Sequence, residues 1–175
     1  MRHLVLLILL AGCGSVVPRT AMMLNAMNPL ATDPAALAVS VDLPPGLGII
    51  DDSVIFAAEA SNPDRGMRSG DWVLFEDRDV EGRPSYRFSD SDAAELRNLQ
   101  SEIAIWEADD PRGTKGSFSV NIGVCRSVPA ATLADARGSL FISMDPDEPP
   151  MPLVRNGPIN RLVDADTLEV LPPCS

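Results

Sequence analysis

The stretch that decides the fold runs from residue 117 to residue 125 and reads Ser-Phe-Ser-Val-Asn-Ile-Gly-Val-Cys. Its apolar residues alternate with small or polar ones, so that Phe118, Val120, Ile122 and Val124 fall on one face of an extended chain. A period of two is typical of a strand that is buried on one face only. By the same alternation, Cys125 points away from the apolar face. The stretch therefore predicts a strand whose cysteine lies outside the core.

Similar patterns recur on both sides of this strand. Residues 37–43 alternate in the same way and predict a half-buried strand that Pro44-Pro45-Gly46 ends. Further short strands are predicted at residues 53–60, 72–76, 85–88, 139–144, 151–155 and 159–163. Residues 72–76 and 85–88 suit a hairpin, and Asn156-Gly157 suits a tight hairpin turn between the last two strands. Seven or eight short strands at this spacing indicate a sandwich or a barrel.

One helix is predicted among the strands, at about residues 92–108. Four apolar residues recur at spacings of three and four: Leu96, Leu99, Ile103 and Trp106. Asp92, with Glu95 three residues later, suits an N-terminal cap, and Pro111 cannot extend the helix. The expected fold is therefore mainly β, a single antiparallel β-sandwich or barrel-like domain with one α-helix packed across a sheet.

The chain begins with a charged start, an apolar run from Leu4 to Leu10 and two small residues before Cys13. This run is shorter than the roughly 20 residues that span a bilayer, which indicates a signal peptide. Leu10-Ala11-Gly12-Cys13 resembles a bacterial lipobox. The resemblance implies cleavage before Cys13 and a lipid anchor of diacylglycerol and palmitate on this cysteine. The alternative is ordinary cleavage nearby, which leaves Cys13 as an odd thiol.

The residue after the lipobox cysteine bears on the address of the protein. It is Gly14 and not the aspartate of inner-membrane retention signals, which by resemblance to sorted lipoproteins favours the outer membrane with the domain in the periplasm. The expected organisation is a signal peptide at residues 1–12, a lipidated tether at 13–34 and a β-rich periplasmic domain at 35–175. Within the tether, Met22, Met23, Ala26, Met27 and Leu30 recur at helical spacing and predict a short amphipathic segment packed on the domain.

Composition limits the partners. The sequence has 14 basic and 25 acidic side chains, and loss of Arg2 with the signal peptide takes the net charge from −11 to −12. An acidic body is repelled by phosphate backbones and by anionic headgroups. We therefore expect no nucleic-acid partner, and contact with the membrane only through the lipid on Cys13.

Three cysteines are present, and the lipid takes Cys13. Cys125 and Cys174 remain as an even pair in an oxidising compartment, which predicts one disulfide. For a loop of roughly 50 residues the chain-entropy model gives about 4 kcal/mol of stabilisation. Two cysteines without a histidine make a poor metal site, so no metal is expected there.

Most kinds of catalytic chemistry lack a residue to carry them. The only histidine, His3, leaves with the signal peptide, which removes Ser-His and Cys-His pairs and histidine zinc sites. Lys115 and Ser117 are the remaining candidates for a dyad, but they fall beside a solvated turn where lysine stays charged. We expect no enzyme and no cofactor.

Other chemistry is left open as weaker alternatives. Asp90, Asp92 and Glu95 suit a calcium site, although acidic residues are also expected at the start of a helix. A hydrolase that uses carboxylates alone would draw on Asp90, Asp92 and Glu102. Asp51-Asp52 and residues 145–148 are expected to be loop charges, and Met23 with Met27 is a weak candidate for Cu(I). The aromatic residues Trp72, Phe75, Trp106, Phe118 and Phe141 are all expected in the core.

A family resemblance rests on three features: the lipobox, residues 28–44 and Pro152-Leu153-Val154-Arg155-Asn156-Gly157-Pro158. These features resemble small alphaproteobacterial lipoproteins from marine species, for which no activity is assigned. The resemblance implies the cellular address and no functional residue. The expected function is a non-enzymatic interaction or structural module of the cell envelope with a protein partner. The alternative is a module that binds a small ligand, a glycan or a cation.

Overall fold

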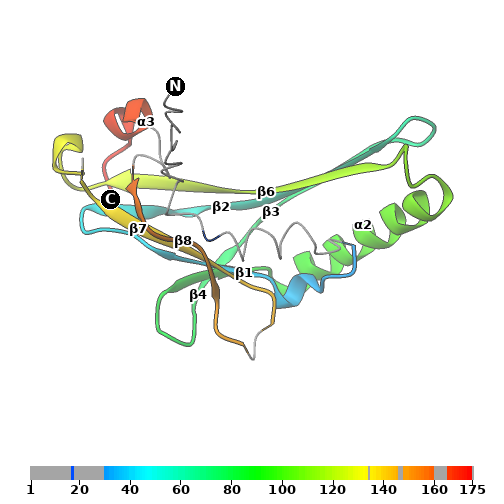
Figure 1. Ribbon diagram of the computed structural model, residues 1–175, viewed down its shortest axis with the longest axis horizontal. Coiled ribbons are helices and arrows are strands. Elements are labelled where there is room, and N and C mark those ends of the chain that lie inside the picture. Colours follow the sequence, from blue (N-terminus) through cyan, green and yellow to red (C-terminus); the bar gives the residue numbers. More distant parts are fainter. Residues whose placement is uncertain (1–16, 18–29, 134, 146–147, 160–164, 175) are drawn as a thin grey trace, which may run out of the picture.

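The protein folds into two antiparallel sheets and one long helix (Figure 1). In this computed structural model, residues 17, 30–133, 135–145, 148–159 and 165–174 are described. One sheet has five strands in the order β4-β5-β1-β7-β8, and the other has three in the order β3-β2-β6. The prediction of a mainly β, sandwich-like domain with one packed helix is confirmed.

The elements follow one another along the chain as η1 (Pro34–Ala36), β1 (Ala38–Asp42), β2 (Leu47–Asn62), β3 (Gly66–Val73), β4 (Phe75–Arg78), β5 (Pro84–Arg87), α2 (Asp90–Asp109), β6 (Lys115–Arg126), η2 (Ala130–Leu133), β7 (Arg137–Ser143), β8 (Met151–Pro158) and α3 (Ala165–Val170). Strands β2 and β6 run the length of the molecule and form its long sheet with β3. The five-stranded sheet faces one part of this long sheet, and helix α2 lies along another part (Figure 1).

Strand β6 is the strand expected from the alternating stretch, and its long pairing with β2 contains a bulge. Ile49 pairs with Val124 and Val54 with Ile122, so β2 carries three more residues than β6 in this interval. The excess lets Ile49 and Val54 both pack against the main core, although they are five residues apart. The bulge thus keeps apolar side chains before and after it directed toward the core.

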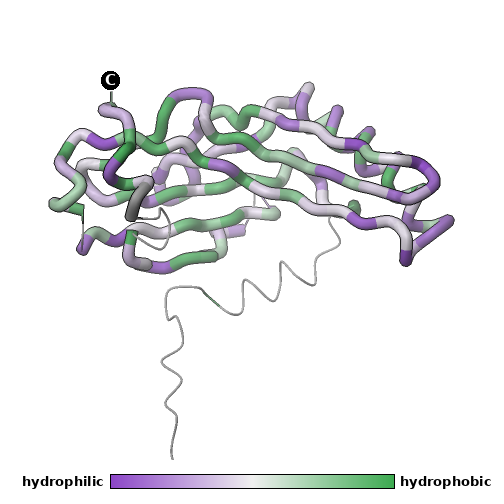
Figure 2. The backbone as a smooth tube through the Cα atoms, turned by 90° about the horizontal axis from the view of Figure 1, so that it is seen from above, coloured by the Kyte–Doolittle hydropathy of each residue, from purple (hydrophilic) through white to green (hydrophobic). Residues whose placement is uncertain are grey.

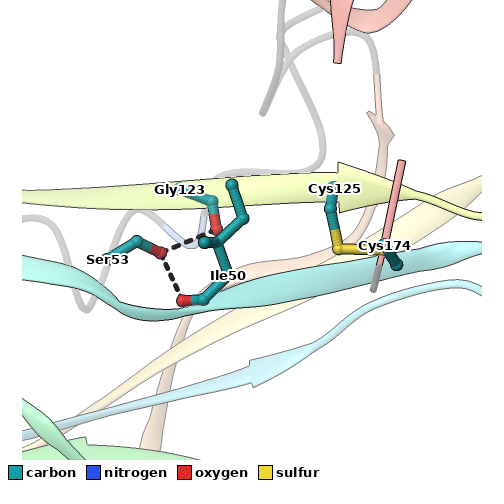
Figure 3. Close-up of a disulfide and its surroundings, with 5 residues drawn as sticks. All are labelled: Ile50, Ser53, Gly123, Cys125 and Cys174. Atoms are coloured by element: carbon teal, nitrogen blue, oxygen red, sulfur yellow. Dashed lines mark hydrogen bonds between the residues drawn. A yellow bond between two sulfur atoms is a disulfide. The ribbon is translucent and has the colours of Figure 1, made fainter. Parts of the chain in front are cut away.

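A serine and a glycine hold the bulge in place (Figure 3). The Ser53 hydroxyl lies 2.6 Å from the carbonyl oxygen of Ile50 and 3.1 Å from that of Gly123. A Cβ atom at Gly123 would lie only 2.6 Å from Ser53 Cβ. Glycine is therefore required opposite the bulge because Ser53 lies directly above it.

The chain passes from the long sheet to the five-stranded sheet at Leu74. Trp72 pairs with Phe56 in the long sheet, whereas Glu76 pairs with Tyr86 in the other. The prediction of one strand over residues 72–76 was therefore wrong, because two strands of different sheets follow each other without a turn. The hairpin with residues 84–87 is present as β4 and β5.

Helix α2 begins two residues earlier than expected. Ser89 caps it by accepting a hydrogen bond of 3.2 Å from the amide of Asp92, so the prediction of Asp92 as the cap was wrong. Asp90 and Asp92 lie in the first turn, where the helix dipole favours negative charge. Trp72 Nε1 donates to Glu95 at 3.2 Å and joins the helix to β3.

Strand β1 lies in the middle of the five-stranded sheet between β5 and β7. Ala38 and Ser40 are buried as well as Val39 and Val41, so this strand is buried on both faces and the prediction of a half-buried strand was wrong. Ser40 pairs with Phe141, whose ring is covered by the Arg83 guanidinium at 3.9 Å. Small side chains fit beneath this pair.

The last strand also differs from the prediction. Arg137 pairs with Pro158 and Gly138 with Gly157, so β8 continues through Asn156-Gly157 and no hairpin turn forms there. Asn156 has a φ of 47° beside a register shift, and its amide donates to Ser139 Oγ. The residue suits a bulge as well as a turn because asparagine tolerates the left-handed conformation. Most of the strand predicted at 159–163 lies outside the described residues.

Three apolar clusters stabilise the molecule, and one of them, formed by Ala60, Ile103 and Trp106, joins the long sheet to the second half of α2. The main cluster joins both sheets and the start of α2. A second cluster consists of Leu133, Ile159, Leu168 and Leu171. Helix α3, which the sequence did not predict, supplies Leu168 and closes this end of the molecule. At the opposite end, hydrophilic residues gather around the turns (Figure 2).

Candidate functional site

The two sheets and α2 enclose an apolar cavity of about 510 Å³. It begins between the two sheets and continues between the long sheet and helix α2. A cavity of this size is within the range of small-molecule binding sites, roughly 300 to 1,000 Å³. None of the three apolar clusters fills it.

The inner end of the cavity is formed by residues of both sheets. Val39 and Ile142 come from the five-stranded sheet, and Phe56 comes from β2. Phe88, just after β5, packs edge-on against Phe56 with ring centroids 5.1 Å apart. These side chains belong to the main core or pack beside it, so the inner end is a rigid and apolar wall.

Helix α2 forms one long side. Leu96, Leu99, Gln100, Ile103 and Glu107 line the cavity and recur at spacings of three and four. Leu96 and Ile103 are buried, whereas Glu107 is exposed. The helix therefore presents apolar side chains near its start and a carboxylate near its end.

Two polar contacts hold the segment before β1 against this helix. Gln100 Nε2 donates to the carbonyl oxygen of Thr32 at 2.9 Å, and Arg97 Nη2 donates to Asp33 Oδ1 at 2.6 Å. The amide of Ala35 and the Arg97 guanidinium lower the pKa of Asp33 below its ordinary value. The contacts place Thr32 in the wall of the cavity beside Leu30, which also lines it.

Polar lining residues occur in two places. Thr32 and Gln100 lie along the cavity and are joined by a hydrogen bond, and Glu107 and Thr114 lie at the outer end. Glu59 also borders the cavity, but it falls between the inward-facing Ala58 and Ala60, so alternation turns its side chain to the outer face. Among the described lining residues, none is lysine or arginine.

The cavity opens beside Phe118. This ring stacks on Phe56 at 5.9 Å with an interplanar angle of 9°, yet 43% of the residue remains exposed. The prediction that all five aromatic residues lie in the core was therefore wrong for Phe118, and also for Phe75, which is 45% exposed. Phe118 faces inward as its alternation indicates, but the space that it faces is unfilled.

The lining residues of the cavity are mostly apolar. Among the described residues, no group of three or more His, Cys, Asp or Glu side chains could hold a metal ion. The pKa of Tyr86 is raised to about 12 by burial and by the negative charges of Glu76 and Asp51, but Tyr86 does not line the cavity. The cavity thus combines an apolar wall with one exposed carboxylate.

The structure places one set of predicted site residues together. Cys125 and Cys174 are joined by a disulfide with a Cα–Cα distance of 5.0 Å, as the sequence predicts (Figure 3). The bond lies against Gly48, where a Cβ atom would lie 3.1 Å from Cys125 Sγ. Cys125 belongs to none of the three apolar clusters, yet it is buried, with 6% of its surface exposed, so the prediction of a cysteine outside the core holds for its contacts but not for its exposure. Arg126 extends the link through backbone hydrogen bonds with Pro172 and Cys174.

The predicted lipidation site is outside the described residues, as are His3, Met23 and Met27. Of the expected tether, Val17 and residues 30–34 are described. The amide of Val17 donates to the carbonyl oxygen of Leu153 at 3.0 Å, which brings this residue to the edge of β8.

The weaker catalytic and metal candidates have structural roles. Glu95 accepts the hydrogen bond from Trp72, and Glu102 forms an ion pair of 2.9 Å with Arg68. Asp90 and Asp92 lie in the first turn of α2. Lys115 and Ser117 are both exposed at the start of β6. None of these residues forms a cluster with converging carboxylates.

The described part of the chain contains no helix with the length and apolar character that a membrane crossing requires. The chain matches no family model, no curated protein and no solved structure. The cavity itself was not predicted from the sequence. The alternation over residues 118–124 indicates that Phe118 faces inward. Alternation does not reveal, however, whether the volume that a side chain faces is filled.

Proposed function

We propose that this protein is a non-enzymatic module of the cell envelope, anchored by lipid on Cys13, whose domain binds an apolar small molecule. The observation that carries the binding function is the cavity of about 510 Å³ between the two sheets and α2. A mostly apolar pocket with a few polar groups at one end is typical of small-molecule sites. The absence of histidine from the chain after residue 3 supports binding without covalent chemistry.

The binding function is tested by blocking the cavity from β2. Ala58 lines the cavity, whereas Ala57 is turned to the outer face of the same strand. Ala58→Phe is expected to weaken binding of an uncharged fluorescent apolar probe at least tenfold, because the ring occupies the space. Ala57→Phe, the matched control, should bind within twofold of the unmodified chain.

Thermal unfolding of both variants controls for folding. If Ala58→Phe folds and binds the probe as well as the unmodified chain does, the cavity is not the binding site. The anchor is tested separately by mass measurement of the mature N-terminus. An N-terminus without acyl chains would remove the lipid from the proposal and leave the cavity unaffected.

A second candidate function, docking of an envelope protein, is favoured by the edge of β6. In the described residues this strand pairs along its length with β2 alone, and residues 116–124 contain neither a charged residue nor a proline. Protein edges usually carry such residues because an unprotected edge pairs with other chains. Photocrosslinking in cells from position 119 should trap one partner, and repeated failure across growth conditions would contradict this candidate.

A further inference from the structure

The ligand class of the cavity follows from its volume, its shape and its charge, and this inference rests on the proposed binding function. An engineered apolar cavity of about 150 Å³ holds one benzene molecule. By that measure a cavity of about 510 Å³ has room for about 20 carbon atoms. This is the size of one long alkyl chain or of a few fused rings.

The shape favours the chain. Leu96 and Glu107 both line the cavity, and the rise of α2 separates them by about 16 Å along the helix axis. On the opposite side, the lining residues of β2 run from Phe56 to Ala60. The cavity is thus long and is bounded by two elements along its length, which suits an extended chain better than a compact ring system.

The inner and outer ends of the cavity differ in polarity, and Thr32 and Gln100, which are hydrogen-bonded to each other, lie between them. The inner end is apolar, where Val39, Leu74 and Phe88 line it. The outer end carries Glu107 and Thr114. A ligand with an apolar tail and a polar head matches this gradient, and its tail would lie between the sheets.

The negative charge at the outer end of the cavity limits which polar head group a ligand can carry. Glu107 lies four residues after the buried Ile103, so its carboxylate extends along the face of α2 that borders the cavity. No described lining residue is basic. Lys115 and Ser117 occupy positions of β6 that alternate with the inward-facing ones, so Lys115 points to the outer face of the sheet. A carboxylate accepts hydrogen bonds and repels anions. A hydroxyl head can donate to it.

We propose that the ligand is a single-chain amphiphile with an uncharged, hydroxyl-bearing head, of the monoacylglycerol type. The alkyl chain lies between the sheets and α2, and a head hydroxyl donates a hydrogen bond to Glu107.

Three twelve-carbon probes that differ in the head test this assignment: 1-dodecanoylglycerol, dodecanoate and dodecyltrimethylammonium. Each displaces an uncharged fluorescent probe from the full-length chain produced without acylation (Cys13→Ser), below its micelle concentration, at pH 8 and physiological salt. We expect the glycerol ester to bind at least tenfold more tightly than dodecanoate. It should also bind more tightly than the trimethylammonium compound, which has no proton to donate.

Two variants assign the selectivity to one side chain. Glu107→Gln should reduce the preference for the ester over dodecanoate to threefold or less, because the amide still accepts a hydrogen bond but no longer repels an anion. Glu59→Gln removes the same charge from the outer face of the sheet and should leave the preference unchanged.

The outcomes separate this inference from the proposed function. If all three probes bind equally, or if the ammonium or dodecanoate binds most tightly, apolar binding stands and the hydroxyl head is wrong. Loss of the preference in Glu59→Gln as well would show that net charge selects the head, and would also overturn the inference. If no probe binds, another part of the chain or a second copy fills the cavity, and the proposed function fails too.

Discussion

The two ends of the long sheet differ in how completely side chains fill the space between the elements. At one end, the disulfide and the cluster around Leu133 and Ile159 close the structure, and both residues are at most 1% exposed. At the other end, α2 lies over the sheet and leaves a cavity, with Phe118 still 43% exposed. The difference teaches that one end is closed by filled packing, whereas at the other end the cluster of Ala60, Ile103 and Trp106 lies beside unfilled volume. Three experiments test this division.

Removal of the disulfide should have the largest effect. The variant with Cys125→Ala and Cys174→Ala is expected to lose about 4 kcal/mol of unfolding free energy, because a loop of 49 residues is no longer closed in the unfolded chain. Urea unfolding measures the loss, and reduced unmodified protein should behave like the variant. Affinity for the apolar probe should stay within twofold. Equal stability of the variant and the oxidised protein would show that the disulfide does not stabilise this end.

Truncation of one leucine at each end gives the next largest effect. Leu133→Ala should cost about 3 kcal/mol, because it leaves a new void in a filled cluster. Leu99→Ala should cost only about 1 kcal/mol, because Leu99 is half-buried and already borders empty volume. The comparison uses the same chemical change and the same unfolding assay. A cost at Leu99 as large as that at Leu133 would mean that the α2 end is as well packed as the other.

The ion pairs give the smallest expected difference. The Asp79 side chain is 4% exposed and pairs with Arg83 at 2.7 Å on the five-stranded sheet, whereas Arg68 and Glu102 pair at the α2 end with side chains 52% and 40% exposed. Asp79→Asn should cost about 2 kcal/mol at pH 7, since hydrogen bonds to a buried charge are lost. Glu102→Gln should cost less than about 0.5 kcal/mol.

Low pH should abolish the stabilisation of the fold by the ionised Asp79 carboxylate. Burial alone would raise the pKa of Asp79, but hydrogen bonds from the Arg83 side chain and from the amides of Arg83 and Glu81 outweigh it and lower the pKa. A lowered folded-state pKa stabilises the fold above the unfolded value of about 3.9, and this contribution disappears as pH falls through the folded value. The difference in unfolding free energy between Asp79→Asn and the unmodified protein should therefore narrow below about pH 4. A difference that stays constant to pH 2 would show that shape and not charge matters at this position.

Strong periodicity made much of the fold predictable. The alternation from Phe118 to Val124 identified β6, and the spacing from Leu96 to Trp106 identified α2. The errors have local causes. Trp72 and Glu76 look like one strand because the chain changes sheets without a turn, and the sequence around Leu74 contains no glycine or proline to mark the change.

The candidate site could not be predicted in the same way. The disulfide followed from counting cysteines, because only one pair remained after Cys13. The cavity depends on how far α2 stands from the sheet, and no residue pattern encodes that distance. Phe118 shows the difficulty, because its alternation gives the correct face but does not indicate that the facing volume is open.

The link between Cys125 and Cys174 also imposes an order of events on biogenesis. The two cysteines are 49 residues apart, and β7, β8 and α3 lie between them in the sequence. The bond can therefore form only after all of these elements have been synthesised, and it requires oxidising conditions. Until then Cys125 carries a free thiol beside Gly48, open to pairing with the wrong cysteine. The closed end of the molecule is thus completed last, and its oxidation marks a chain that has been synthesised through Cys174 and has folded.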